Sequence, residues 1–323
     1  MTLSTSRSSR APYIGLGLGL LAVSTASVFI RYALAAGAPA LVIAAWRLGL
    51  ASLALLPVVV LRHRPELRAL TGRQLGLALV SGVFLALHFG TWITSLAHTT
   101  VANAAVLVSS SPLFVALIAA LFLREKLTRA LIVGLALTLA GGGIVGVGDA
   151  CLGSVCPPVS EFLRGEAFFG DMLALAGAAA MAVYFTVGKA LRASLSLVMY
   201  IFLTYSTAAL VLMGATLVAH QLLTGYAGPA YLWFGLLAFV PQLIGHSSFN
   251  WALKYLSATY VSITILGEPL GSALLALWLL GEQPGLFKLM GGALILIGIF
   301  IASRPSTAPL RGAAQDAKCE SES

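Results

Sequence analysis

The feature that most constrains this chain is a succession of apolar segments, each about as long as a membrane-spanning helix. A helix needs roughly 20 mostly apolar residues to cross the hydrocarbon core of a bilayer. Ten segments reach this length: 13–35, 40–61, 74–97, 101–123, 129–148, 171–190, 196–220, 229–253, 258–280 and 286–303. Runs of this length without alternating polarity are not barrel strands. The sequence therefore predicts an all-α integral membrane protein with ten transmembrane helices.

The composition excludes a soluble protein. Of the 323 residues, 59% are hydrophobic and only 9% are charged, with a mean hydropathy of +0.97. An ordinary soluble domain has about 25% charged residues. The core of a globular chain of this length is too small to bury so much apolar surface. A net charge of +8 would suggest nucleic acid in a soluble protein. Here we interpret it as a charge asymmetry between membrane faces, and we expect no nucleic-acid partner.

The distribution of Lys and Arg predicts the orientation. If the N-terminus is inside, the inner side carries fifteen of these cations: Arg7, Arg10, Arg62, Arg64, Arg68, Arg73, Arg124, Lys126, Arg129, Lys189, Arg192, Lys254, Arg304, Arg311 and Lys318. The outer side carries two, Arg164 and Lys288. Cytoplasmic loops are enriched in Lys and Arg. We therefore expect a multi-pass protein of the cell (inner) membrane with both termini in the cytoplasm.

The cysteines fit this topology. Cys151 and Cys156 share the long outer loop, and Cys319 lies in the inner tail. An oxidising compartment would permit a Cys151–Cys156 disulfide, and two free thiols are the alternative.

The chain contains an internal repeat. A shift of 157 positions aligns the later parts of the two halves without gaps, and the matched pairs include Pro112 with Pro269, Glu125 with Glu282, Gly134 with Gly291 and Gly141 with Gly298. Each half has five predicted spans, and an odd number inverts the second half relative to the first. Inverted repeats are typical of secondary transporters that bind substrate near the midplane. The expected organisation is a tail (1–12), a first repeat (13–148), an outer loop (149–169), a second repeat (170–303) and a disordered tail (304–323).

The repeated segments also carry a family resemblance. "SSSPLFVALIAALFLREKLT" and "GEPLGSALLALWLLGEQP", together with "ALVIAAWRLGLASLALLP" and "GDMLALAGAAAMAVYFTVGKALR", resemble the EamA domain of the drug/metabolite transporter superfamily. The resemblance covers roughly residues 13–148 and 170–303 and departs in the long outer loop. It implies a ten-helix exporter or exchanger of small metabolites, with a cavity built by helices 1–4 and 6–9.

Polar residues at helical spacing within the spans predict the cavity lining. The candidates are His88, Trp92, Tyr184, Tyr205, Gln242, His246 and Asn250. Each could instead be a satisfied residue of the helix bundle. The fifth and tenth spans carry glycines such as Gly141 and Gly298 in place of a polar stripe, and we expect them to lie outside the cavity.

Three charged residues lie within predicted spans: Arg31, Arg47 and Glu268. A charge at the bilayer centre costs about 2.5–3.5 kcal/mol, so such residues usually face a cavity or a partner. Glu268 could form an ion pair with Arg31 or Arg47, or it could carry a coupling proton. Arg47 could be structural or a gate. We group the three as candidates for coupling or gating.

These patterns predict a secondary transporter that exports an amino acid or similar solute by alternating access, with a proton or an exchanged solute as its coupling partner. A facilitative channel is the alternative. An intramembrane hydrolase using Ser110 with His88 or His246 is a remote one. We expect no enzyme activity, cofactor or metal, since the sequence has no nucleotide-binding, metalloprotease or serine-hydrolase motif. A monomer is expected because two fused repeats already supply both halves.

Overall fold

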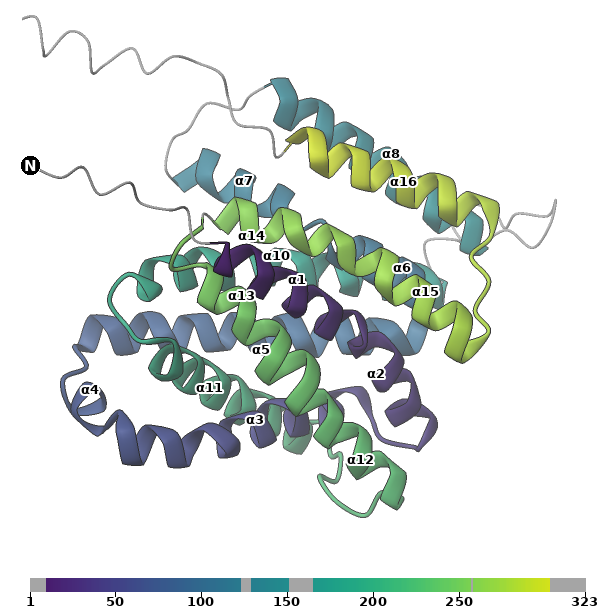
Figure 1. The fold of residues 1–323 in the computed structure, drawn as a ribbon. Coiled ribbons are helices and arrows are strands. Elements are labelled where there is room, and N and C mark those ends of the chain that lie inside the picture. The colour runs from purple at the N-terminus through teal and green to yellow at the C-terminus, as the bar shows by residue number, and fades with distance from the viewer. Residues whose placement is uncertain (1–9, 123–128, 151–164, 257, 303–323) are drawn as a thin grey trace, which may run out of the picture.

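The computed structural model describes residues 10–122, 129–150, 165–256 and 258–302, and these residues form helices and the turns that connect them (Figure 1). The first half contains α1 (Ala11–Ser24), α2 (Ala26–Ala35), α3 (Ala40–Arg62), α4 (Arg64–Arg68), α5 (Gly72–His98), α6 (Val101–Val108), α7 (Ser111–Phe122) and α8 (Arg129–Ala150). The second contains α10 (Glu166–Arg192), α11 (Leu197–Val218), α12 (Gly228–Leu237), η1 (Ala238–His246), α13 (Ser247–Ala252), α14 (Ala258–Thr264), η2 (Ile265–Gly267), α15 (Glu268–Leu280) and α16 (Leu286–Ala302).

The all-helical prediction is confirmed, and each predicted span coincides with one helix or with consecutive helices. Within the described ranges, six helices are long and apolar enough to cross a membrane: Ala11–Ala35, Ala40–Arg62, Gly72–His98, Glu166–Arg192, Leu197–Val218 and Gly228–Ala252. Shorter apolar helices cover Asn103–Ile118, Ile132–Gly142, Leu270–Leu280 and Leu289–Gly298. Cys151, Cys156, Glu125 and the tail 304–323 lie outside the described residues.

The fourth and ninth predicted spans are both interrupted, at equivalent points. Between α6 and α7 the break falls at Ser109 and Ser110, and between α14 and α15 it is the 3-10 turn η2. The starts of α6 and α14, and of α7 and α15, are each 157 positions apart. Proline occupies the first turn of both α7 and α15, where its missing N–H is tolerated. The internal repeat is therefore also a repeat of broken helices.

The eighth predicted span contains a π-helical segment, η1. Pro241 lies inside η1, and a π-turn accommodates one residue more than an α-turn. The corresponding helix of the first half, α5, is α-helical along its whole length. The π-helical geometry thus distinguishes the second half from the first in the segment that carries Gln242 and His246.

Helices α8 and α16 lie against each other at one side of the bundle (Figure 1). A Cβ on Gly141 would lie 2.6 Å from the Gly291 carbonyl oxygen, and one on Gly298 would lie 2.7 Å from that of Gly134. Only glycine permits this approach. Because Gly134 faces Gly298 while Gly141 faces Gly291, the two equivalent helices run antiparallel.

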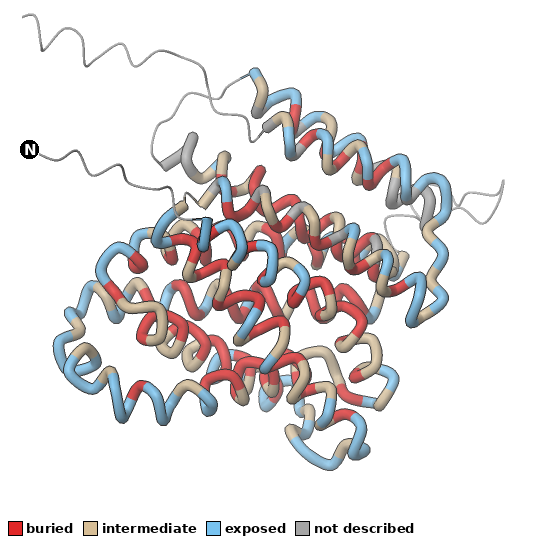
Figure 2. The backbone as a smooth tube through the Cα atoms, in the orientation of Figure 1, coloured by how far each residue is buried: buried red, intermediate tan, exposed pale blue. Residues whose placement is uncertain are grey.

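The interior of the bundle is buried and its outer surface is apolar. Figure 2 shows buried residues concentrated where the helices face one another. Large apolar side chains face outward, including Leu61 (81% exposed) and Trp278 (80% exposed). This distribution is typical of a lipid-facing surface.

Candidate functional site

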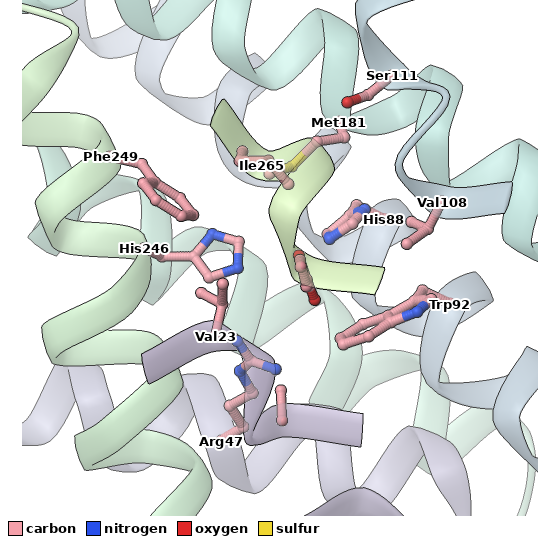
Figure 3. Close-up of a pocket in the computed structure, with 12 residues that line it drawn as sticks. Val23, Arg47, His88, Trp92, Val108, Ser111, Met181, His246, Phe249 and Ile265 are labelled. Carbon is pink, nitrogen blue, oxygen red and sulfur yellow. The ribbon is translucent and has the colours of Figure 1, made fainter. Parts of the chain in front are cut away.

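A cavity lies inside the bundle (Figure 3). Its walls come from both repeats and consist of Val23, Ala26, Arg47, His88, Trp92, Val108, Ser111, Met181, His246, Phe249, Ile265 and Glu268. Of the predicted residues, the walls include Arg47, His88, Trp92, His246 and Glu268.

Equivalent residues of the two repeats line opposite parts of this cavity. The equivalences are fixed by matching contacts: Gly19 packs against Phe249 and the Gly245 backbone, and Gly177 packs in the same way against Trp92 and the His88 backbone. Shifts of 157 or 158 positions then give four equivalent pairs in the wall: Val23 with Met181, Trp92 with Phe249, Val108 with Ile265 and Ser111 with Glu268. The cavity therefore lies where the two repeats meet.

Each ionisable residue of the wall has a non-ionisable counterpart in the other repeat. Arg47 corresponds to Thr204, and Glu268 corresponds to Ser111. His88 corresponds to Gly245, and His246 corresponds to Phe89, by the same matching. The backbone of the site is repeated, whereas its charge is not.

The Arg47 side chain is completely buried and only partly satisfied. Its Nε donates a hydrogen bond to Gln242 Oε1 at 2.8 Å, and its guanidinium carbon lies 4.1 Å from the centre of the Phe89 ring. Neither Nη1 nor Nη2 has a hydrogen-bond partner among the described residues. Gln242 and Phe89 thus fix the guanidinium while leaving two donors unused.

Two histidines and Trp92 form an aromatic group on another side of the cavity. His88 Nδ1 lies 2.9 Å from the Gly177 carbonyl oxygen, so a proton on Nδ1 makes it the donor. The His88 ring stacks on Trp92 with centres 5.9 Å apart and lies 6.3 Å from His246. Trp92 Nε1 and His246 Nδ1 have no partner in the described part of the chain.

The remaining predicted residues form a buried network that does not line the cavity. Tyr184 donates to Asn250 Oδ1 at 2.9 Å, and Asn250 Nδ2 donates to Tyr205 at 3.3 Å. Tyr205 also lies 3.3 Å from the Ser247 hydroxyl. Together with Gln242, these residues support the wall from behind.

Glu268 and Arg31 occupy separate places. The Glu268 side chain is 8% exposed and lines the cavity, and the structure gives it no hydrogen bond or ion pair with another described residue. Arg31 lies away from the cavity, where it donates to the Thr99 carbonyl oxygen at 2.6 Å and pairs with Glu282 at 3.5 Å. Neither Arg31 nor Arg47 forms the ion pair with Glu268 that the sequence allowed as one alternative.

Sequence reasoning did not identify the apolar wall. Val23, Val108, Met181, Phe249 and Ile265 give no periodic signal that separates them from lipid-facing or core residues. Equivalence between the repeats could have identified them, because each has its counterpart in the wall or beside it.

The site carries no metal-binding or hydrolytic arrangement among the described residues. No group of three His, Cys, Asp or Glu side chains is gathered there. Ser110 donates its hydroxyl proton to the Leu107 carbonyl oxygen at 2.7 Å and does not line the cavity. The hydrolase alternative therefore has no structural support.

The chain is similar to known transporters. A protein of Archaeoglobus fulgidus described as an uncharacterized transporter is 30% identical over 89% of this chain and 94% of its own. A probable terminal-alkyne amino-acid exporter of Streptantibioticus cattleyicolor is 27% identical over 64% of this chain and 65% of its own. A pseudopaline exporter of Pseudomonas aeruginosa is 29% identical over 73% of this chain and 78% of its own length.

A solved crystal structure shares the fold. It superimposes with a TM-score of 0.62 at 18% identity and covers 91% of this chain and 97% of its own. The model of the EamA-like transporter family matches residues 12–147 and 168–304, once in each repeat. The chain is thus a multi-pass membrane transporter of small solutes, not an enzyme, and it belongs to the EamA-like transporter family.

Proposed function

We propose that this protein is a secondary transporter that exports an amino acid or a similar small metabolite by alternating access between its two repeats. The observation that carries the proposal is the cavity whose walls are supplied by equivalent residues of both repeats. A site at the meeting of two repeats can be exposed to either side when one repeat moves against the other.

The proposed topology has ten spans with both termini in the cytoplasm. The first repeat comprises residues 13–148 and the second 170–303, with tails at 1–12 and 304–323 and an outer loop at 149–169. The antiparallel contact between the equivalent helices α8 and α16 supports the inverted arrangement. We propose a monomer as the transporting unit.

Hydrogen bonds of the same kind occur at equivalent positions of the two repeats. Arg31 binds the Thr99 carbonyl, and its equivalent Lys189 donates to the Leu256 carbonyl at 2.9 Å, where Leu256 is the equivalent of Thr99. In an inverted repeat these contacts lie at opposite ends of the bundle. We propose that each helps to close its end of the cavity and that the Arg31–Glu282 pair must break when its end opens.

Glu268 is the proposed coupling group. It is a buried carboxylate in the cavity wall, and such residues often serve as proton carriers in transporters. A proton or an exchanged solute would supply the driving force.

The relatives named as exporters of an amino acid and of pseudopaline support export of small polar metabolites. The test is counterflow in proteoliposomes reconstituted with the purified protein. An alternating-access transporter preloaded with unlabelled substrate accelerates uptake of labelled substrate. A facilitative channel, the alternative, shows no such stimulation, and this result would overturn the proposal.

A further inference from the structure

We infer that the cavity recognises both charged groups of a free α-amino acid with an apolar side chain: Arg47 binds the carboxylate and Glu268 binds the ammonium. This inference rests on the proposed transport function and specifies the substrate that the same site takes.

The unused donors of Arg47 point to an anionic group. A buried guanidinium whose Nη1 and Nη2 lack acceptors is costly, since buried polar groups are almost always paired. Gln242 binds Nε and leaves both Nη atoms for a planar acceptor. A carboxylate matches that pair of donors. Trp92 Nε1, also unpartnered among the described residues, is a further donor in the same wall, and the unpartnered His246 Nδ1 is another when it carries a proton.

Glu268 supplies the complementary charge. It lines the same cavity, lies at the start of α15 just after the break in the helix, and forms no ion pair with Arg47. Both charges therefore remain available to a ligand. A bound ammonium would give the Glu268 carboxylate the partner that the described residues do not provide.

Charge balance favours a zwitterion over either monovalent ion. Besides the two histidines, the wall carries one basic side chain, Arg47, and one acidic side chain, Glu268, at positions that the repeat does not make equivalent. A zwitterion compensates both charges, whereas a simple amine or acid leaves one of them buried without a partner. Because the two charges come from nonequivalent positions, the ligand has a single favoured orientation.

The rest of the wall selects the side chain. Val23, Val108, Met181, Ile265 and Phe249 offer an apolar surface without a further charge. This surface suits an aliphatic or aromatic side chain, since burial of apolar area is favourable.

The experiment uses three matched probes per side chain with the full-length protein in detergent: L-leucine, 3-methylbutylamine and 4-methylpentanoate, and the corresponding set from L-phenylalanine. Thermal stabilisation at increasing probe concentration gives the relative affinities. The unsubstituted protein is expected to bind the amino acids roughly tenfold or more tighter than the matched amine or acid, because each lacks one ionic contact.

Two variants make the assignment specific. In Glu268→Gln the relative binding affinity shifts from the amino acid toward the matched acid. In Arg47→Gln it shifts from the amino acid toward the matched amine. A gain of affinity for the matched monovalent probe cannot come from a misfolded protein. Glu66→Gln and Arg73→Gln, which alter charges outside the cavity, serve as matched controls and keep the original preference.

Equal affinity for amino acid, amine and acid would overturn the inference, as would an unchanged order of preference in both variants. Failure to bind either amino acid would also overturn it. The proposed transport function is judged separately, by counterflow against a panel that includes sugars and nucleobases. Saturable counterflow of such a solute would refute the zwitterion assignment while leaving the transport function intact.

Discussion

Arg31 of the first repeat and Glu282 of the second form an ion pair of 3.5 Å that joins α2 to the turn after α15. The pair is anchored on both sides, because Arg31 also binds the Thr99 carbonyl and Glu282 accepts a hydrogen bond from the Val101 amide at 3.2 Å. Four segments from both repeats thus converge at one end of the bundle.

Loss of this pair is expected to alter gating more than binding. In Arg31→Gln or Glu282→Gln we expect an altered counterflow rate with little change in the concentration for half-maximal transport. The direct stability effect of a pair whose side chains are 26% and 28% exposed is small, about 0.2–1 kcal/mol. The exchanged variant Arg31→Glu/Glu282→Arg should recover part of the rate. If both single variants transport at the original rate, the gating role is wrong.

Glu66 is expected to make stability depend on pH. Burial raises the pKa of Glu66, but hydrogen bonds from the Ser196 hydroxyl (2.6 Å) and amide (2.7 Å) and from His63 outweigh this effect, and the net pKa is lowered. A lowered pKa stabilises the folded protein above the ordinary Glu pKa of about 4.3, and the contribution is lost as the pH falls through the folded pKa.

Glu66→Gln should therefore lower the melting temperature at pH 7. Its effect on the melting temperature should be smaller at pH values below the pKa of a free Glu carboxyl. A fluorescence-monitored melting series over pH gives the comparison. A difference from the original protein that is the same at every pH would contradict this account.

The α8–α16 contact is expected to tolerate no side chain at Gly141. Gly141→Leu would place atoms against the Gly291 carbonyl and Ile295, and overpacking of this kind costs about 1–3 kcal/mol. The matched control is Gly142→Ala, whose added Cβ meets only Leu107 at 3.8 Å. Thermal melting of the two purified variants provides the measurement, and equal melting temperatures would refute the close approach.

A coupling role of Glu268 makes a separate prediction. Gln is isosteric with Glu but cannot exchange a proton, so Glu268→Gln should remove the pH dependence of substrate transport while the protein level stays normal. Uptake rates of the original and substituted proteins are compared across a series of pH values on both sides of proteoliposomes. An unchanged pH dependence would exclude Glu268 as the proton carrier.

The sequence was sufficient for the all-helical class of fold, and several of its conspicuous ionisable residues line the cavity. Arg47, His88 and Glu268 stand out within apolar segments, because the cost of a polar residue in a membrane makes each one conspicuous. Helical periodicity identifies a face of a helix, but it does not give the depth of a residue behind the cavity wall. For this reason Tyr184, Tyr205 and Asn250 were predicted alongside His88, although the structure places them in a supporting network.

The irregular helices were harder to predict. The π-helical segment η1 changes the angular relation of Gln242, His246 and Asn250, so their four-residue spacing does not put all three in the wall. The partner of Arg31 was likewise unpredictable, because Glu282 is distant in sequence and lies beside a turn.

The central claim is that a single cavity between the repeats is exposed to each side of the membrane in turn. The most direct measurement places a thiol at Ser111, in the cavity wall, by Ser111→Cys in a protein with Cys151→Ser, Cys156→Ser and Cys319→Ser. A membrane-impermeant thiol reagent is then applied from either side of right-side-out and inside-out vesicles. The account predicts labelling from both sides, protection by substrate, and no leak of small ions. Labelling from one side alone, or labelling from both sides with an ion leak, would contradict it.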